Sequence, residues 1–276
     1  MRVAAVVVSY NSSRDLPMSL GSLHALPLDR IVVVDNSSTD DSVRIARSYT
    51  PHVLTLPNVG FGAAINAAVE SVPDVDAYLL FNPDCHIADK DYAVLVEALR
   101  SDARFGAVAP LMRYPDGTYG ISSGPEPSMA KEWLAALRVD HLVPRRVKSW
   151  LPRLPFLRSR LRMLEYLDVG PSGETRAASW VSGFCMLVRA RAFHDVGGFD
   201  PGYFLYFEDV DICRRLRDRG WGVASVGSSV ADHKESTSTA AVGKRRLYRS
   251  GMSVYFSKHG TRGQRVLAGA LRRLPI

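Results

Sequence analysis

The sequence predicts an α/β fold in which helices flank a mostly parallel central sheet. Apolar, β-branched runs alternate with helical patterns through the first half of the chain, which is typical of a parallel sheet. The runs are apolar throughout, as in strands that are buried on both faces. Polar clusters follow the ends of several runs, and ligands bind at the carboxyl ends of strands in such sheets. We therefore expect a binding site at one edge of the sheet.

The first half of the chain contains a series of alternating strands and helices. The predicted strands are the apolar runs at 3–8, 31–35, 53–56, 77–81 and 105–109. The predicted helices lie near 14–25, 40–49, 61–71 and 89–101. Asp40 and Ser42 favour the start of the second helix, and Asp89 favours the start of the fourth. The N-terminal run lacks the cleavage pattern of a signal peptide, so we interpret it as a buried strand and expect a cytoplasmic protein.

The second half of the chain is less regular. Residues 123–178 hold many prolines and basic residues and indicate an irregular or helical insertion. A strand is expected over 180–189, and a helix from Glu208 to Arg219 that Gly220 ends. A strand pair near 221–232 and then basic helices follow. The domain boundaries are therefore expected at residues 1–122, 123–178, 179–242 and 243–276.

The charges of the chain are unevenly distributed. The net charge is +7, yet residues 141–164 and 243–276 contain sixteen of the 35 basic residues and no acidic one. The rest of the chain holds all 28 acidic residues against 19 basic ones. This distribution argues against a general nucleic-acid surface and for localised anionic contacts. The cysteines, Cys85, Cys185 and Cys213, are far apart and form no CxxC pair, so we expect free thiols.

Two polar clusters suit recognition of a nucleoside. Ser9-Tyr10-Asn11 follows the first strand, and Asp35 stands at the tip of the second, where a carboxylate can accept hydrogen bonds from a base or ribose. Residues 37–40 are better explained by turn and helix-cap chemistry. Asn58, Gly60 and Gly62 open the third helix, and glycines there let the backbone approach a ligand.

Three further clusters suit metal and acid–base chemistry. In Asn82-Pro83-Asp84 a carboxylate follows a strand and could bind a hard divalent cation, although an ordinary Pro-Asp turn also fits. Glu208 and Asp209 begin a helix after an aromatic run. The helix dipole would favour them there, but the aromatic surroundings suit a general base. His233 is either a metal ligand or a plain polar residue.

In combination and order, these motifs resemble the family-2 glycosyltransferases, and most of all their rhamnosyltransferase branch. The motifs are VVVSYNS, VVDNSSTDDS, NVGFGAAIN, FNPD, WVSGFCMLVRARAF, GGFDPGYFLYFEDVDICRRL and the late His233. The resemblance covers roughly residues 2–260 and is weakest over 123–178. It implies the GT-A fold, a Rossmann-like, mostly parallel central sheet flanked by helices, here with a C-terminal helical extension.

The resemblance also implies a reaction. It is an inverting, metal-dependent transfer of a sugar, first of all rhamnose from dTDP-rhamnose, with UDP and GDP donors left open. The acceptor would be a hydroxyl on a polyprenyl-diphosphate-linked glycan in cell-wall or surface polysaccharide synthesis. Residues 1–122 would bind the nucleotide sugar, 123–178 and 179–242 would form the acceptor and catalytic side, and 243–276 would form basic helices. The oligomeric state is not predicted.

The resemblance assigns roles to individual residues. Asp209 would be the catalytic base, and Glu208 would orient the acceptor or the base. Asp84 and His233 would bind Mg²⁺ or Mn²⁺, with Asn82 standing where the usual motif has a first aspartate. The donor-binding residues would be Ser9, Tyr10, Asn11, Asp35, Asn58, Gly60, Gly62, Asn66 and Asn82. The acceptor pocket would be bordered by Trp180, Ser182 and Gly183.

Alternatives remain for the function and for the basic segments. A nucleotidyltransferase would favour a glycine- and lysine-containing loop after the first strand, which 9–13 lacks. A non-catalytic sugar-nucleotide or nucleic-acid-binding module would leave the carboxylates among aromatics unexplained. The basic, amphipathic residues 266–274 and the tryptophan-containing segment near Trp150 suit an anionic membrane surface, such as the inner face of the plasma membrane. A solvated basic face is the other interpretation.

Overall fold

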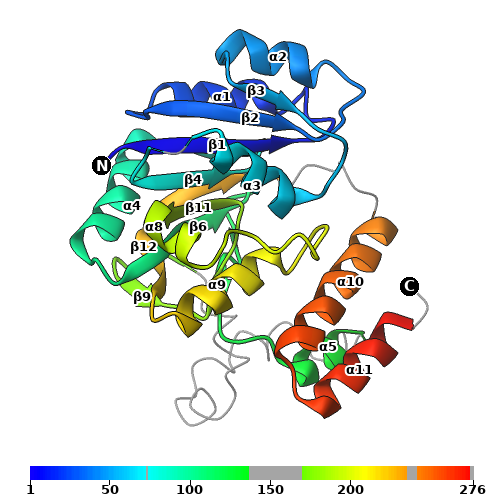
Figure 1. The fold of residues 1–276 in the computed structure, drawn as a ribbon. Helices are drawn as coiled ribbons and strands as arrows, with labels where there is room; N and C mark the ends of the chain where they lie inside the picture. The colour runs from blue at the N-terminus through cyan, green and yellow to red at the C-terminus, as the bar shows by residue number, and fades with distance from the viewer. Residues whose placement is uncertain (73, 137–169, 235–240, 274–276) are drawn as a thin grey trace.

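The computed structural model describes residues 1–72, 74–136, 170–234 and 241–273 (Figure 1). Within these residues the main element is a ten-stranded sheet in which the longest path runs β3-β2-β1-β4-β11-β6-β12-β5. Two short strands, β7 and β9, pair with β6 and β12. In chain order the strands are β1 Val3–Ser9, β2 Arg30–Asp35, β3 Val53–Thr55, β4 Ala77–Phe81, β5 Cys85–Ile87, β6 Phe105–Arg113, β7 Tyr119–Gly120, β9 Thr175–Ala177, β11 Cys185–Arg189 and β12 Gly222–His233.

The strand directions bring the predicted polar clusters to one edge of the sheet. The strands β1, β2, β3 and β4 are mutually parallel. Strand β11 is antiparallel to both β4 and β6, and β6 is parallel to β12. Strands β4, β6 and β12 therefore run in the same direction. The ends of β1, β2 and β4 consequently meet at one edge, as the sequence predicts. The end of β12 lies at the same edge and brings His233 there.

Helices cover both faces of the sheet. Along β1, Val3, Ala5 and Val7 enter one core cluster while the residues between them enter the other, because successive strand side chains point to opposite faces. The first cluster lies under α1 Leu16–His24, α2 Ser42–Tyr49 and α4 Asp89–Ser101, and the second under α3 Phe61–Glu70, α8 Ala190–Asp195 and α9 Glu208–Asp218. Each large apolar side chain buried in this way contributes about 1.5–3 kcal/mol. The predicted α/β fold class is confirmed.

Two expectations for the second half were wrong in detail. The predicted strand over 180–189 is two strands, β10 Trp180–Val181 and β11, and β10 pairs with β8 Ser123–Gly124 outside the main sheet. The predicted strand pair near 221–232 is the single strand β12. Its pairing with β6 shifts between Val226 and Val230. A methyl group on Gly227 would collide with the Ser172 hydroxyl, so this glycine marks an irregularity within a strand, and no turn occurs there.

The C-terminal helices form a separate layer beside α9. They are α10 Ala241–His259 and α11 Arg262–Arg273, and they pack with α5 Met129–Ala136 (Figure 1). A third core cluster, which includes Tyr203, Phe207, Met252 and Leu271, joins these helices to the segment before α9. The predicted basic helices are thus confirmed. The basic segment 141–164 lies outside the described residues. Among the residues described, no helix has the length and apolarity that a membrane crossing requires.

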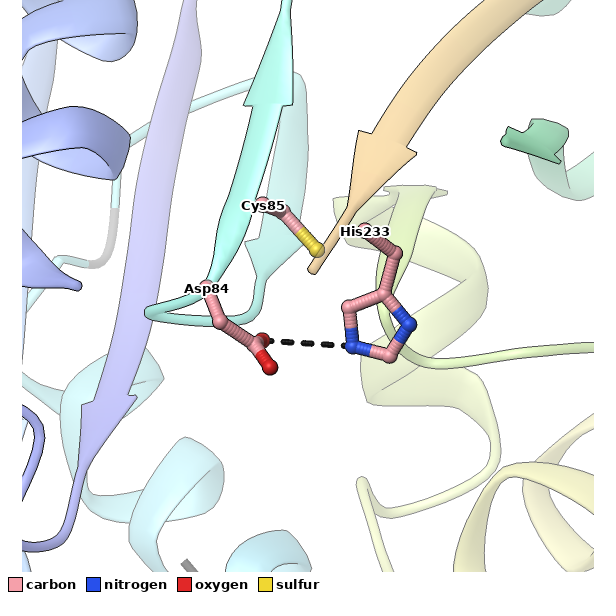
Figure 2. Close-up of side chains that lie close together, drawn as sticks. All are labelled: Asp84, Cys85 and His233. Atoms are coloured by element: carbon pink, nitrogen blue, oxygen red, sulfur yellow. Dashed lines mark ion pairs between the residues drawn. The ribbon is translucent and has the colours of Figure 1, made fainter. Parts of the chain in front are cut away.

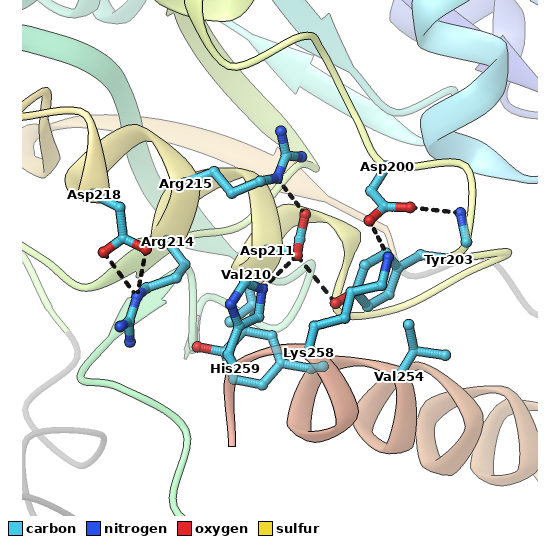
Figure 3. Close-up of polar contacts among 12 residues, drawn as sticks. Asp200, Tyr203, Val210, Asp211, Arg214, Arg215, Asp218, Val254, Lys258 and His259 are labelled. Carbon is cyan, nitrogen blue, oxygen red and sulfur yellow. Dashed lines mark hydrogen bonds and ion pairs between the residues drawn. The ribbon is translucent and has the colours of Figure 1, made fainter. Parts of the chain in front are cut away.

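Polar contacts fix α10 to α9 (Figure 3). The Asp211 carboxylate on α9 accepts hydrogen bonds from the Tyr203 hydroxyl at 3.1 Å and from Arg215 Nε at 2.7 Å. His259 Nε2, at the end of α10, lies 2.7 Å from the same carboxylate. Lys258, the residue before His259 on α10, forms an ion pair with Asp200. The end of α10 is therefore held against the helix that begins with Glu208 and Asp209.

Candidate active site

A cavity of about 550 Å³ opens at the edge of the sheet where the polar clusters meet. This volume lies within the range of small-molecule sites. Its lining comes from the ends of β1, β4 and β12, from the start of α3, from residues 204–206 and from α10. Of the predicted site residues, those that line the cavity are Tyr10, Asn58, Gly60, Asn82, Asp84 and His233.

Asp84 and His233 form a pair of donor atoms within this cavity. Asp84 lies just beyond β4 and His233 ends β12, and the Asp84 Oδ1 and His233 Nε2 atoms are 3.2 Å apart (Figure 2). Asp84 is buried, and the side chain of His233 is mostly so. The Lys234 N–H donates to the Asp84 carbonyl at 3.0 Å, which fixes the two segments together. The Phe184 ring packs against the imidazole, with 5.5 Å between ring centroids.

The chemistry of this pair fits a divalent cation. A carboxylate oxygen and an imidazole nitrogen that each ligate one ion at about 2.1 Å lie about 3 Å apart, as these atoms do. The Cys85 sulfur lies within 4.8 Å of both, and it points toward His233 in Figure 2. Burial raises the pKa of Cys85 well above its ordinary value. Hard divalent cations such as Mg²⁺ prefer oxygen ligands to sulfur. The oxygen and nitrogen donors therefore define the candidate metal site.

Glu208 and Asp209 begin α9 after two residues with unusual backbone geometry. Tyr206 and Phe207 have φ angles of 69° and 71°, in the left-handed region that residues other than glycine rarely adopt. Such strain persists only where the surrounding structure enforces it, and it is common at functional sites. Here the Phe204 carbonyl accepts a hydrogen bond from the Phe61 N–H at 3.0 Å. The start of α9 is therefore held in position by α3.

The two carboxylates differ in their partners. Asp209 is half-buried, and its oxygens accept hydrogen bonds from the Gly183 N–H at 3.1 Å and the Val210 N–H at 2.8 Å. The Ser182 hydroxyl also bonds this carboxylate. Glu208 is buried, and its Oε2 atom has no partner among the described residues. Burial raises the pKa of both carboxyl groups, and the hydrogen bonds to Asp209 oppose the rise there.

One short segment joins the carboxylate pair to the candidate metal site. Residues 182–184 connect β10 with β11, and Gly183 bonds Asp209 while Phe184 contacts His233. The Phe184 carbonyl accepts a hydrogen bond from the Asn82 N–H at 2.8 Å. Glu208 and Asp209 do not line the cavity themselves. Gly183 lies between Asp209 and the Phe61 ring, and Phe61 does line it.

The residues that were predicted at the nucleoside end of the site lie at the tips of β1 and β2. The Asp35 Oδ2 atom accepts a hydrogen bond from the Ser38 N–H at 2.9 Å. Its buried Oδ1 atom has no partner among the described residues, and neither has the buried Ser9 hydroxyl beside it. A buried acceptor without a partner is costly unless a ligand supplies the donor. Tyr10 is 44% exposed and lines the cavity.

Three predicted donor residues hold the protein's own loops and do not line the cavity. The Asn11 side chain accepts a hydrogen bond from the Thr39 N–H at 2.8 Å. The Asn66 amide donates to the Phe199 carbonyl at 2.8 Å and accepts from the Phe199 N–H at 2.9 Å. A Cβ on Gly62 would come within 2.8 Å of the Phe199 side chain. In the structure, Asn11 and Asn66 therefore hold loops in place through hydrogen bonds, and Gly62 allows close packing against Phe199.

The predicted acceptor residues lie beside Asp209, outside the cavity lining. Ser182 and Gly183 bond the Asp209 carboxylate, and the Trp180 indole N–H donates to the Pro125 carbonyl at 2.9 Å. The cavity also includes residues that the sequence did not single out as site residues. They include Phe204, Leu205 and Tyr206 before α9, and Lys244 and Leu247 on α10. The aromatic run signalled the first group, whereas nothing distinguishes Lys244 within its basic run.

Comparison with solved structures supports the fold. The mannosyltransferase PcManGT of Pyrobaculum calidifontis, solved with GDP-Man and Mn²⁺, superposes with a TM-score of 0.62 at 15% identity and covers 98% of this chain and 69% of that one. GalNAc-T7, solved with UDP, GalNAc and Mn²⁺, gives a TM-score of 0.61 at 14% identity. That match covers 98% of this chain and 54% of the GalNAc-T7 chain, so this chain spans about half of it. The fold is GT-A.

Comparison of sequences identifies the family. Residues 4–164 match the model of glycosyl transferase family 2. The chain is 34% identical over 251 residues to the N-acetylglucosaminyl-diphospho-decaprenol L-rhamnosyltransferase of Mycobacterium tuberculosis, and the match covers 85% of this chain and 76% of the relative. It is also 57% identical over 37 residues to the rhamnosyltransferase WbbL of Escherichia coli, which is 13% of this chain and 14% of the relative. This chain belongs to glycosyl transferase family 2, within its rhamnosyltransferase-like branch.

Proposed function

We propose that this glycosyltransferase moves a sugar from a nucleotide-diphosphate donor to an acceptor hydroxyl in one displacement, with inversion at the anomeric carbon. The observation that carries the proposal is the bridge formed by residues 182–184. It holds the Asp209 carboxylate on one side and the His233 ring of the Asp84–His233 pair on the other. A base and a candidate metal site are thus fixed relative to each other by one short segment.

Asp209 acts as the base in this proposal. Its carboxylate accepts the proton of the acceptor hydroxyl while the hydroxyl oxygen bonds to the anomeric carbon and the bond from that carbon to the diphosphate oxygen breaks. The transition state is oxocarbenium-like, as in glycoside hydrolysis. Because one carboxylate opposite the leaving group is enough for this step, no covalent sugar–enzyme intermediate forms.

Glu208 and Asp209 share one proton over part of the pH range. Glu208 is buried and Asp209 is half-buried, and two such neighbouring carboxyl groups do not readily carry two charges. Asp209 has the N–H groups of Gly183 and Val210 to stabilise its charge, whereas the Glu208 Oε2 atom has no partner among the described residues. The proton therefore resides on Glu208, and Asp209 is the group free to accept another.

Asp84 and His233 hold Mg²⁺ or Mn²⁺ in this proposal. Their donor atoms and spacing fit such an ion, and two structural neighbours were solved with Mn²⁺. The bound ion would neutralise charge on the diphosphate leaving group. Asn82 beside them is neutral, so the site offers one carboxylate fewer than the usual motif of the family.

The donor is proposed to be dTDP-rhamnose. The rhamnosyltransferase-like branch favours this sugar, as do the names of the relatives from Mycobacterium tuberculosis and Escherichia coli. The unpartnered Oδ1 atom of Asp35 offers an acceptor for an N–H of the base or a hydroxyl of the sugar ring of the nucleoside. Tyr10 offers an exposed ring to the cavity, and Asn36, the residue after Asp35, also lines it.

The acceptor is proposed to be a polyprenyl-diphosphate-linked glycan of cell-wall or surface polysaccharide synthesis. The Mycobacterium tuberculosis relative is named for such an acceptor. Helix α11 has four arginines and exposes Val266 and Leu267, which suits contact with anionic lipid headgroups. We therefore propose that the protein works on the inner face of the plasma membrane.

The substitution Asp209→Asn tests the assignment of the base. The amide keeps the size of the side chain but cannot accept the proton, so turnover should fall by about 100-fold or more while donor binding stays unchanged. Turnover is measured as nucleoside-diphosphate release from candidate sugar nucleotides with metal and lipid acceptor. Asp218→Asn, a carboxylate at the far end of α9, serves as the control. Near-wild-type turnover by Asp209→Asn would refute the assignment.

A further inference from the structure

Helix α10 forms part of the cavity wall. Lys244 and Leu247 lie on one side of this helix, about one turn apart, and both line the cavity. The helix is pressed against residues 203–207, because a methyl group on Gly251 would collide with the Tyr206 carbonyl. Its far end is held by His259 on Asp211 (Figure 3). Lys244 is thus presented to the cavity by a helix anchored at several points.

Lys244 differs from other cations near the site because it has no partner in the described part of the chain. Lys234 pairs with Asp15 at 2.9 Å, and Arg113 pairs with Asp232 at 2.6 Å. Among the residues that the structure describes, Lys244 makes no ion pair or hydrogen bond. The acidic and basic side chains in the described lining are Asp84, His233 and Lys244, and the tyrosines there, Tyr10 and Tyr206, are neutral near pH 7. The cavity therefore contains an ammonium group that no described residue pairs with through an ion pair or hydrogen bond.

A diphosphate is the ligand that this arrangement fits. Both phosphates of a nucleotide sugar are negative, and more charge develops on the outer phosphate as its bond to the sugar breaks. A fixed cation aimed at the place where that charge develops stabilises the transition state more than the ground state. With Asn82 neutral, a diphosphate meets one carboxylate in the cavity, Asp84, and one permanent cation, Lys244.

We propose that Lys244 binds the diphosphate of the donor and stabilises the departing nucleoside diphosphate. This inference rests on the proposed function and adds a residue from outside the sheet to the donor site. It makes α10 a part of the catalytic centre as well as a support for it. The preference of the cavity for a diphosphate over a monophosphate is then set by the C-terminal helices.

The test compares Lys244→Met with wild-type protein by calorimetry, using dTDP, UDP and GDP and the corresponding monophosphates, each with Mg²⁺. Methionine keeps much of the length of the side chain and removes its charge. We expect the best-bound nucleoside diphosphate to bind Lys244→Met about 10- to 100-fold more weakly, because a charge-assisted contact is lost. The monophosphate should change by less than about threefold, and Lys244→Arg should retain most of the diphosphate affinity.

Matched controls come from the same helix. Arg245 and Arg246 are exposed and do not line the cavity, so alanine at either position should leave diphosphate affinity unchanged. Equal diphosphate affinity in wild type and Lys244→Met would overturn the inference and leave the proposed function standing. An equal loss for mono- and diphosphate would overturn it too, because the effect would then be on cavity shape. If no nucleoside diphosphate binds the wild type, the proposed function fails and the inference fails with it.

Discussion

Asn82 stands where the usual metal-binding motif of the family has its first aspartate. The negative charge that the motif offers is therefore carried by one side chain. Asp84 is the carboxylate among the described lining residues, and it lies 3.2 Å from His233 Nε2. An asparagine can still offer a carbonyl oxygen to a metal, but without charge. If the proposed metal binds here, its affinity should therefore depend more strongly on Asp84 than it would in a site with two aspartates.

Asp84→Ala should abolish the dependence of nucleoside-diphosphate binding on metal. Wild-type protein should bind the nucleotide more tightly with Mg²⁺ or Mn²⁺ than with EDTA, and the variant should bind it equally weakly in both, at least about tenfold below wild type with metal. Calorimetry with and without metal measures this. Asp232→Ala is the control, because this neighbouring carboxylate pairs with Arg113 outside the cavity lining. Metal dependence that survives in Asp84→Ala would move the metal site elsewhere.

Single residues show where sequence patterns succeed and fail at a site. Asp84 could be placed at the binding edge because parallel strands end at a common edge, whereas the family resemblance assigns His233 beside it. Asn66 belongs to an equally strong motif, yet its amide bonds the backbone of Phe199, 133 positions away along the chain. A sequence motif indicates that a residue type is needed at a position. It does not show whether the side chain contacts a ligand or another part of the protein. The sequence does not indicate Lys244 as a residue of the cavity, because it stands in a run of basic residues and has no feature that distinguishes it from them.

Among the elements, α10 connects the cavity to the C-terminal layer. Its contact with the loop before α9 depends on Gly251, which lies against the Tyr206 carbonyl. This loop holds the two left-handed residues that precede Glu208. A shift of α10 would therefore disturb both the cavity wall and the start of α9.

Gly251→Ala tests this dependence. Although alanine is the better helix former, its methyl group cannot fit against a backbone carbonyl, so we expect a loss of about 1–3 kcal/mol of stability. Gly269→Ala in α11 is the matched control, because nothing lies within 4 Å of the added methyl group, and it should gain about 0.5–1 kcal/mol. Urea unfolding measures both free energies. Equal effects of the two substitutions would contradict the described packing of α10.

The elements of the first half were predictable and several of the second half were not. Strands such as β1 and β4 are uninterrupted apolar runs, and only burial on both faces of a sheet explains such runs. The sequence predicts a strand pair where β12 is a single strand, because a glycine within a strand has the same signature as a turn. Strands β5, in the first half, and β9 have three residues each and lie outside the apolar runs from which strands such as β3 were predicted. Their pairing with β12 comes from tertiary contacts alone.

At the scale of the whole molecule, helix α11 carries both basic side chains and exposed apolar side chains. Val266 is 73% exposed and Leu267 is 44% exposed, on a helix that carries four arginines. The buried residues of the same helix, Ala268 and Leu271, face the protein. The helix thus has an apolar side that packs and a mixed basic and apolar side that does not.

This surface should bind anionic vesicles. Wild-type protein should co-sediment with phosphatidylglycerol vesicles at low salt and be released at high salt, because the attraction is screened. Changing Val266 and Leu267 together to aspartate should weaken binding by about tenfold or more. Met18→Asp, at an exposed apolar position on α1, is the control and should bind as wild type. Absence of wild-type binding to these vesicles would remove the membrane proposal.

The position of β11 in the sheet has a consequence for how the chain folds. This strand separates β4 from β6, although it follows β6 by more than seventy residues in sequence. Until it has been synthesised, the edge of β4 has no partner, and the strands up to β6 cannot join into one sheet. Such long-range pairing raises contact order and slows folding, and an open strand edge invites association with other chains. Expression at lower temperature or with chaperones should therefore improve the soluble yield of this protein.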